Sequence, residues 1–394
     1  MTRGGRRWLV VAAAFGSMFT VFGVAYSFGA FFEPMAREFH TNRASTSAVF
    51  SITAFLYFGL GSVTGAIADR VGPRRVLAFG AVVTGAGLIL TSYTPSIWIG
   101  YLTYGLGGGI GTACGYVPMV AAVGGWFTRG RSFAIGVAVT GIGFGTLFVA
   151  PLAAALIKGV GWRQTYLWFG IASLLVLLAC AALAERPPAR GQSDLRVGPA
   201  VRTREFAGMY ASGVLVSFSL FIAFVHLAAF AAHRGADAVA SAALIGVIGA
   251  ASAVGRLALG GIAERIGAVR AFQSATVLLA FSFGIWLLFP SYLGLALFAV
   301  VLGVGYGGWV ALSPSVLAEL FGAERLGGTA GALFTAAGVG ALLGPPLAGL
   351  LVDRTGSYTV AIAAALALGL VGIPPILWLP RRRVSSSHGD RQQS

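Results

Sequence analysis

The sequence predicts an all-α membrane protein that crosses a bilayer twelve times, and three observations support this prediction. Of the 394 residues, 57% are hydrophobic and 10% are charged, and the mean hydropathy is +0.85. A water-soluble domain could not bury so large an apolar share of its residues. The few charged residues fall between long apolar runs, and the second half of the chain repeats features of the first. Together these observations indicate a polytopic membrane protein.

The apolar runs follow one another along the whole chain. A helix needs about 20 residues to cross the hydrocarbon core of a bilayer. The runs bounded by charges lie at residues 8–32, 45–68, 76–95, 96–126, 132–157, 163–184, 206–232, 239–263, 271–290, 291–320, 326–352 and 359–380. The first is too long and too aromatic for a cleaved signal peptide, and further spans follow it at once. We therefore expect twelve transmembrane helices.

Membrane topology accounts for the net charge of +15. If the N-terminus is cytoplasmic, the cytoplasmic segments hold 20 of the 27 Lys and Arg residues, and the outer loops hold six. This asymmetry follows the rule that positive charges gather on the cytoplasmic side. We expect a multi-pass protein of the plasma (inner) membrane with both termini in the cytoplasm and no nucleic acid partner.

An internal repeat relates the two halves of the chain. The segment Gly65–Arg75 (GAIADRVGPRR) recurs 195 residues later as Gly260–Arg270 (GGIAERIGAVR). A second match at the same offset pairs Gly143, Gly145 and Pro151 with Gly338, Gly340 and Pro346. Two matches at one offset indicate a duplicated unit. Duplicated six-helix halves place a substrate site near the membrane midplane, between the halves.

The repeat and a polar segment rich in Pro and Arg define the expected domain organisation. We expect an N-terminal six-helix bundle at 1–185, a cytoplasmic linker at 186–205, a C-terminal six-helix bundle at 206–380 and a cytoplasmic tail at 381–394. Cys114 and Cys180 fall in apolar segments on different helices, so nothing indicates a disulfide, a metal site or a cofactor.

Arg256 lies within the apolar run 239–263, roughly 12 Å inside the membrane edge by helical rise. An arginine at such depth costs about 2.5–3.5 kcal/mol on insertion scales. It cannot lose its charge, and the neighbouring helices offer almost no carboxylate. These facts predict a binding site for an anion. The alternative is a structural arginine bonded to backbone carbonyls or to Ser252, one turn away.

Three further polar side chains lie deep in the expected spans. His226 is roughly 9 Å from the outer end of its helix and can exchange a proton near neutral pH. The alternative is a neutral histidine that donates to a backbone carbonyl. Tyr116 and Tyr306 lie near the middle of the fourth and tenth spans, where a hydroxyl needs a partner. They are candidates for contact with a substrate, or else for ordinary helix packing.

Several segments resemble the major facilitator superfamily. The loop GAIADRVGPRR is similar to that superfamily's signature loop between helices 2 and 3. Trp126–Gly145 (WFTRGRSFAIGVAVTGIGFG), Tyr26–Phe32 (YSFGAFF) and the helix-8 segment GRLALGGIAERIG resemble the monocarboxylate transporter family. The resemblance covers essentially the whole chain. It implies the major facilitator fold, with twelve transmembrane helices in two pseudo-symmetric six-helix bundles.

The resemblance also implies roles for individual residues. Arg256 matches the family's helix-8 arginine, which pairs with the substrate carboxylate through two parallel hydrogen bonds. The residues expected to line the substrate cavity with it are Tyr116, Tyr306, Tyr26, Ile142 and Phe334. The residues expected to latch the cytoplasmic side in the outward-open state are Asp69, Arg70, Glu264 and Arg265. The alternative for this last group is a set of simple interface charges.

Two departures from the family pattern concern proton coupling. Ser252 stands where the animal members carry an aspartate, and Tyr26 stands where they carry a lysine. His226 is therefore the candidate for proton coupling, and the alternative is a substrate that binds as the neutral acid. The helix expected at 326–352 has no cation before its end, whereas the related oxalate exchangers use a second cation there. A single central cation favours a monoanion over a dicarboxylate.

We therefore expect a secondary active transporter that carries a small monocarboxylate, such as lactate or pyruvate, in symport with a proton. It would work by alternating access as a monomer in the lipid bilayer. The alternative is a facilitator for another organic anion, or a drug exporter, with Arg256 structural. An enzyme is not expected, because the spans contain no paired Asp, no HExxH motif and no recognisable Ser–His motif.

Overall fold

The structure is a computed structural model that describes residues 3–127, 130–187, 199–322 and 326–380. Its regular elements are helices, and the prediction of an all-α membrane fold is confirmed. In chain order they are α1 (Arg3–Tyr26), α2 (Phe28–Glu38), α3 (Arg43–Val71), α4 (Pro73–Ser92), α5 (Ile97–Gly100), the π-helix η1 (Tyr101–Leu106), α6 (Gly107–Trp126), α7 (Arg131–Leu183), the 3-10 helix η2 (Pro199–Arg202), α8 (Arg204–His233), α9 (Ala238–Ile266), α10 (Ala268–Leu288), α11 (Tyr292–Phe321), α12 (Leu326–Thr355), α13 (Tyr358–Val371) and α14 (Pro374–Leu377).

Eleven helical segments of the described residues are long and apolar enough to cross a membrane. One of them, Phe133–Leu183, is 51 residues long, which exceeds a single crossing by more than twofold. It is broken at Gly161, whose φ of 83° and ψ of 162° are not helical. Glycine adopts this positive φ without the strain that a side chain would bring. The break divides α7 into two segments, each long enough to cross, so the described residues supply twelve candidate crossings, as the sequence predicts.

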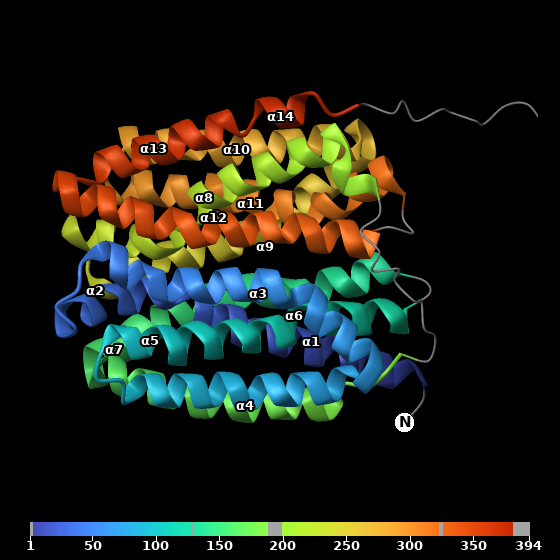
Figure 1. Ribbon diagram of the computed structural model, residues 1–394, viewed down its shortest axis with the longest axis horizontal. Helices are drawn as coiled ribbons and strands as arrows, with labels where there is room; N and C mark the ends of the chain where they lie inside the picture. Colours follow the sequence, from blue (N-terminus) through green and yellow to red (C-terminus); the bar gives the residue numbers. More distant parts are fainter. Residues whose placement is uncertain (1–2, 128–129, 188–198, 323–325, 381–394) are drawn as a thin grey trace, which may run out of the picture.

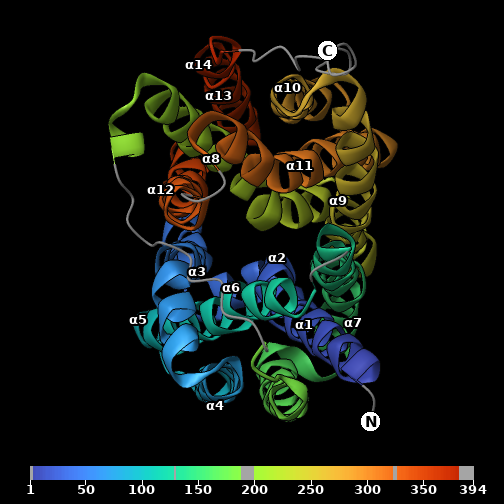
Figure 2. The ribbon, with the colours of Figure 1, turned by 90° about the vertical axis from the view of Figure 1, so that its right-hand side faces the viewer.

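The helices run side by side along the long axis of the molecule in two groups. In Figure 1 the helices from α1 to α7 form the lower group, and those from α8 to α14 form the upper group. Between the groups, α3 packs along α12 and α7 packs along α9. Figure 2, viewed along the helices, shows these two pairs on either side of the centre. We call the groups the first half and the second half.

The two ends of the bundle differ in what they hold. The end where α1 begins, on the right of Figure 1, is called the terminal end here, and the opposite end, with α2, is called the distal end. Most of the expected linker at 186–205, namely residues 188–198, lies outside the described residues, as does the tail at 381–394.

The internal repeat is visible in the backbone. Gly72 ends α3 with φ of 98° and ψ of 149°, and Gly267 ends α9 with φ of 90° and ψ of 151°. Each glycine N–H donates to the carbonyl four residues before it, that of Ala68 or of Ala263. The conformations match at positions 195 residues apart. The sequence repeat therefore corresponds to the same helix end in each half.

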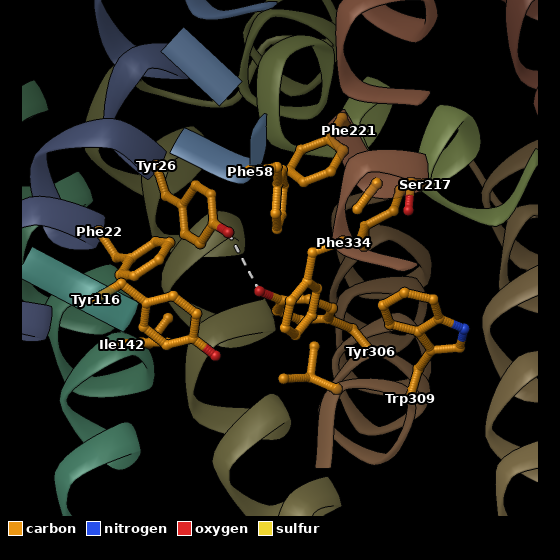
Figure 3. Close-up of a pocket in the computed structure, with 13 residues that line it drawn as sticks. Phe22, Tyr26, Phe58, Tyr116, Ile142, Ser217, Phe221, Tyr306, Trp309 and Phe334 are labelled. Atoms are coloured by element: carbon orange, nitrogen blue, oxygen red, sulfur yellow. Dashed lines mark hydrogen bonds between the residues drawn. The ribbon is translucent and has the colours of Figure 1, made fainter. Parts of the chain in front are cut away.

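The first crossing differs from its prediction as a continuous run at 8–32. It consists of α1 and α2, separated at Ser27, whose hydroxyl donates to the Val24 carbonyl at 2.7 Å. Hydroxyl groups that bond to nearby backbone carbonyls compete with helical hydrogen bonding and bend helices. The break lies next to Tyr26, whose side chain is one of those that surround the pocket in Figure 3.

The distal end is closed by contacts between the halves. Arg43, at the start of α3, lies 3.9 Å from the Asp353 carboxylate on α12, and its Nε donates to the Tyr358 hydroxyl at 3.3 Å. The same guanidinium lies 3.7 Å from Glu33 on α2. Backbone packing is equally close, because a Cβ added to Gly349 would lie 2.7 Å from the Ala44 nitrogen.

Candidate functional site

A pocket lies between the two halves, near the middle of the bundle (Figure 3). Its lining encloses about 410 Å³ not filled by atoms, a value that includes the part open to solvent. Five lining residues come from the first half and eight from the second. They are Phe22, Tyr26, Phe58, Tyr116, Ile142, Ser217, Leu220, Phe221, Tyr306, Trp309, Val310, Phe334 and Ala337. A central pocket between duplicated halves is where transporters of this architecture bind substrate.

The structure brings five of the predicted site residues to this one pocket. Tyr26 on α1, Tyr116 on α6 and Ile142 on α7 lie on the first-half wall, and Tyr306 on α11 and Phe334 on α12 lie on the opposite wall. They come from five helices. Their contact with a substrate stays a prediction.

Three tyrosine hydroxyls form a hydrogen-bonded row at one side of the pocket. The Tyr26 hydroxyl is 3.2 Å from that of Tyr306 and 3.4 Å from that of Tyr57. The bond between Tyr26 and Tyr306 joins the halves and is the dashed line in Figure 3. The Tyr26 ring also stacks on Phe224 of α8, with centroids 4.2 Å apart.

Tyr57 lies behind the pocket lining, in contact with Tyr26, and the sequence did not single it out. It lies on α3, is 3% exposed, and contacts Tyr26 through its hydroxyl. The signal that identified Tyr116 and Tyr306 was a tyrosine near the middle of an apolar span. The same signal is present at Tyr57, in the middle of the span expected at 45–68.

Arg256 lies beside the pocket and is 9% exposed. Its Nη1 donates to the Val139 carbonyl of α7 at 2.9 Å, so the guanidinium of the second half is held by the first half. Its Nε and Nη2 are buried and have no hydrogen-bond acceptor among the described residues. Its Cζ lies 6.0 Å from the centre of the Tyr306 ring, which lines the pocket.

Ser252 is not the partner of Arg256, because its hydroxyl donates to the Gly249 carbonyl at 2.8 Å. The Tyr116 hydroxyl, by contrast, is near enough to the guanidinium to interact with it electrostatically. Among the described residues no three His, Cys, Asp or Glu side chains group in a way that could hold a metal ion. The polar groups available to a ligand are therefore one guanidinium and several hydroxyls, surrounded by aromatic rings.

His226 is fully buried on α8, apart from the pocket lining. Its Nε2 lies 2.9 Å from the Pro345 carbonyl of α12, and its Nδ1 has no partner among the described residues. Its ring packs edge-on against Phe32 and Tyr358, with centroids 5.2 and 5.9 Å away. Tyr358 in turn accepts a hydrogen bond from Arg43. His226 is thus placed between the pocket and the ion pairs that close the distal end.

The four residues expected to form a latch lie at the terminal ends of two related helices. Asp69 and Arg70 are in the last turn of α3, and Glu264 and Arg265 are in the last turn of α9. All four are exposed. The ion pair that joins the halves between Arg43 and Asp353 lies instead at the distal end.

Twelve crossings in two related halves around a central pocket define a membrane transporter. The chain matches the family model of the Major Facilitator Superfamily over residues 13–291 and 262–394. Monocarboxylate transporter 13 of Bos taurus is 33% identical over 386 residues, covering 96% of this chain and 90% of that protein. Monocarboxylate transporter 11 of Homo sapiens is 31% identical, with 96% and 84% covered.

Among solved structures, a bacterial homologue of the human lysosomal transporter Spinster, in an inward-facing and occupied conformation, superposes with a TM-score of 0.77. It is 17% identical and the match covers 94% of this chain and 96% of that one, so the likeness concerns the fold alone. The chain belongs to the Major Facilitator Superfamily, and within it to the monocarboxylate transporter family. It is a multi-pass membrane transporter and not an enzyme.

Proposed function

We propose that this protein carries a monocarboxylate anion, such as lactate or pyruvate, across the membrane in symport with a proton. The observation that supports this most directly is the incomplete hydrogen bonding of the buried Arg256 guanidinium. Its guanidinium is buried, charged at any physiological pH, and only partly hydrogen-bonded by the protein. An anion that neutralises the charge and accepts the remaining hydrogen bonds would complete the site.

The two unpaired donors have the right arrangement for a carboxylate. Nε and Nη2 lie on the same edge of the planar guanidinium, so their N–H groups are parallel and match the two oxygens of one carboxylate. Nη1 is held by Val139, which orients that edge. At 4 Å and an effective dielectric constant of about 20, the attraction between the charges is about 4 kcal/mol before desolvation.

A monoanion is favoured because the pocket lining contains no second cation. The thirteen lining residues include no Lys, Arg or His, and no Asp or Glu. A second carboxylate would have to be buried against aromatic rings without a partner of opposite charge, which is costly. The same lining gives a cationic drug no counter-charge.

Transport would follow from alternating closure of the two ends. In the structure Arg43 and Asp353 hold the distal end, and the bond between Tyr26 and Tyr306 joins the halves at the central pocket. We propose that the terminal end faces the cytoplasm, because the positive charges of the sequence gather on that side of the plasma (inner) membrane. The structure, closed at its distal end, would then be the inward-facing state. In the opposite state Asp69, Arg70, Glu264 and Arg265 would latch the cytoplasmic end. The protein would work as a monomer, since the pocket is formed within one chain.

His226 is the proposed proton carrier. It is a titratable side chain buried between the pocket and the distal ion pairs, and its Nδ1 is unpaired among the described residues. Arg256 cannot release a proton in the working pH range. The other route is uptake of the substrate as the neutral acid, with the carboxylate itself as proton acceptor.

A second candidate function rests on the hydrogen bond from Arg256 to Val139. If the arginine serves only to make this bond, its role is structural, and it links α9 to α7. The protein would then carry another organic anion or export drugs without using the guanidinium.

The decisive test is uptake of radiolabelled lactate into proteoliposomes, with and without an inward proton gradient. We expect the gradient to drive accumulation in the wild type. Arg256→Ala should abolish uptake and binding, and Arg256→Lys should be severely weakened, because an ammonium lacks the planar fork. Arg270→Ala, which removes an exposed arginine of α10, is the matched control and should retain uptake. Wild-type binding affinity in the Ala variant would show that Arg256 is structural.

A further inference from the structure

We propose that Arg43 expels the proton from His226 when the distal end closes. This inference rests on the proposed proton symport and adds the residue that decides where the proton is released. It follows from the half of the protein to which each side chain belongs. His226 lies on α8 in the second half, whereas Arg43 lies at the start of α3 in the first half.

The hydrogen bonds of His226 are those of a neutral ring. Its Nε2 lies 2.9 Å from the Pro345 carbonyl, which can only accept, so Nε2 carries a hydrogen. A protonated ring would carry a second hydrogen on Nδ1. That N–H would be buried without an acceptor among the described residues, which is costly. The structure, closed at its distal end, therefore favours the form of His226 that has lost its proton.

Tyr358 holds the Arg43 guanidinium near His226. Arg43 Nε donates to the Tyr358 hydroxyl at 3.3 Å, and Arg43 Cζ lies 5.8 Å from the centre of the Tyr358 ring. The same ring meets the His226 ring edge-on, with centroids 5.9 Å apart. The guanidinium is near enough to the imidazole to interact with it electrostatically. A positive charge at this position opposes a second positive charge on the imidazole.

Two carboxylates also lie on this side of His226. Glu33 on α2 and Asp353 on α12 pair with Arg43 at 3.7 and 3.9 Å. Arg43 acts on the imidazole more strongly than Asp353 does. Asp353 belongs to the same half as His226, so it remains in that half when the distal end opens, whereas Arg43 moves away with the first half. Opening would therefore favour protonation of His226, and closure would oppose it.

Closure of the distal end would thus drive the release of the proton. The N–H bond at Nδ1 breaks, its electron pair stays on the nitrogen, and a water molecule takes the proton. At that stage Arg43 and Asp353 close the way out through the distal end. The proton would leave toward the terminal end, which is the cytoplasmic side in the proposed orientation.

The test measures how net uptake of labelled lactate depends on the pH inside proteoliposomes, at a fixed pH outside. Arg43→Gln removes the charge but keeps a hydrogen-bond donor for Tyr358. Its uptake should reach half of its maximum at an internal pH about one unit higher than in the wild type, which is about a tenfold change in proton binding. Arg43→Lys keeps the charge and should retain the wild-type profile. An unchanged profile in Arg43→Gln would overturn the inference.

Asp353→Asn separates the charge of Arg43 from the closure that Arg43 makes. This variant breaks the same ion pair between the halves but keeps the positive charge and removes a negative one. Its profile should therefore shift to lower internal pH. A shift to higher internal pH in both variants would mean that loosening of the distal end, and not the charge of Arg43, controls release. Arg37→Gln removes an exposed arginine at the same end and is the control that should match the wild type.

Exchange of labelled for unlabelled lactate needs no release of a proton, so it shows that each variant is folded. If Arg43→Gln has lost exchange, Asp353→Asn decides: a shift to lower internal pH supports the inference, and a higher or unchanged value overturns it. If His226→Gln keeps the wild-type dependence on internal pH, Arg43 does not act through His226, and the inference fails while symport stands. If a proton gradient drives no uptake in the wild type, symport and this inference fail together.

Discussion

The Asp353 carboxylate of the second half accepts a hydrogen bond from the backbone N–H of Ala44 in the first half, at 3.1 Å. Its other oxygen accepts from the N–H of Arg43 at 3.3 Å. Both N–H groups lie in the first turn of α3, where the helix has unsatisfied donors and a partial positive charge. One half of the protein therefore caps a helix of the other half. This contact exists only while the distal end is closed.

Replacing this carboxylate should favour opening of the distal end. Asp353→Asn removes the negative charge from the helix N-terminus and from Arg43, an interaction that contributes about 1–2 kcal/mol in a partly buried setting. The population open at the distal end should rise about fivefold to 30-fold. Double electron–electron resonance between spin labels at Arg37 and Thr355, with Cys114 and Cys180 replaced by Ala, would measure the change.

The control for Asp353 is another helix-capping aspartate. Asp237 caps α9 by accepting from Val239 and Ala240 within its own half. Asp237→Asn should lower stability without changing the distance distribution. If the distance distribution shifts equally in both variants, the loss of a helix cap, and not the loss of a contact between the halves, favours opening of the distal end.

The tyrosine hydroxyls offer a second pair of matched variants. Tyr26→Phe keeps the ring stacked on Phe224 but removes the hydroxyl that joins the halves through Tyr306. A hydrogen bond contributes about 0.5–1.5 kcal/mol, so the distal-open population should rise about twofold to tenfold. Tyr57→Phe removes a bond within the first half only and should leave this population unchanged. The same spin-label distance measures both, and no change in Tyr26→Phe would contradict the prediction.

A variant of His226 tests whether this histidine carries the proton. A glutamine can donate to the Pro345 carbonyl, as the histidine ring does, but cannot carry a proton. His226→Gln should therefore lose accumulation driven by a pH gradient and keep exchange of labelled for unlabelled lactate. The exposed His233, changed to Gln, is the control and should behave as wild type. If gradient-driven accumulation persists in His226→Gln, the histidine is a packing residue and the substrate carboxylate is the proton acceptor.

Dicarboxylates should compete poorly for the site. Oxalate brings a second charge, and the residues that line the pocket provide no second cation. We expect oxalate to inhibit uptake of labelled lactate at least tenfold less effectively than unlabelled lactate does. The monomethyl ester of oxalate has one charge on a similar skeleton and should compete better than oxalate. Stronger competition by oxalate than by lactate would show that the site holds a second carboxylate.

Much of the fold could be predicted from the sequence because its signals are local. Apolar length predicted the crossings, and the recurrence of GAIADRVGPRR as GGIAERIGAVR predicted the two related halves. The depth of Arg256 followed from helical rise. The partners of these residues did not follow. Contacts such as that between Arg43 and Asp353 depend on how each helix is rotated about its axis.

Rotation is hard to predict in a membrane because lipid and helix interiors are both apolar. Hydropathy then does not mark the inward face as it does in a water-soluble helix. This is why Tyr57 was overlooked although it resembles Tyr116 in position. It is also why the break of the first crossing at Ser27 was not expected, since the run of apolar residues continues through it.

Arg256 also gives the transport cycle an electrical character. The guanidinium has no counter-charge in the pocket lining, so the empty site is positive, and a monoanion that enters together with a proton adds no net charge to it. When closure passes from the distal to the terminal end, the voltage drop across the protein moves from one side of the site to the other. A charge that crosses 100 mV in this way changes in energy by about 2.3 kcal/mol. The empty and the loaded carrier should therefore respond to membrane voltage alike, so that the complete symport cycle moves no net charge across the membrane.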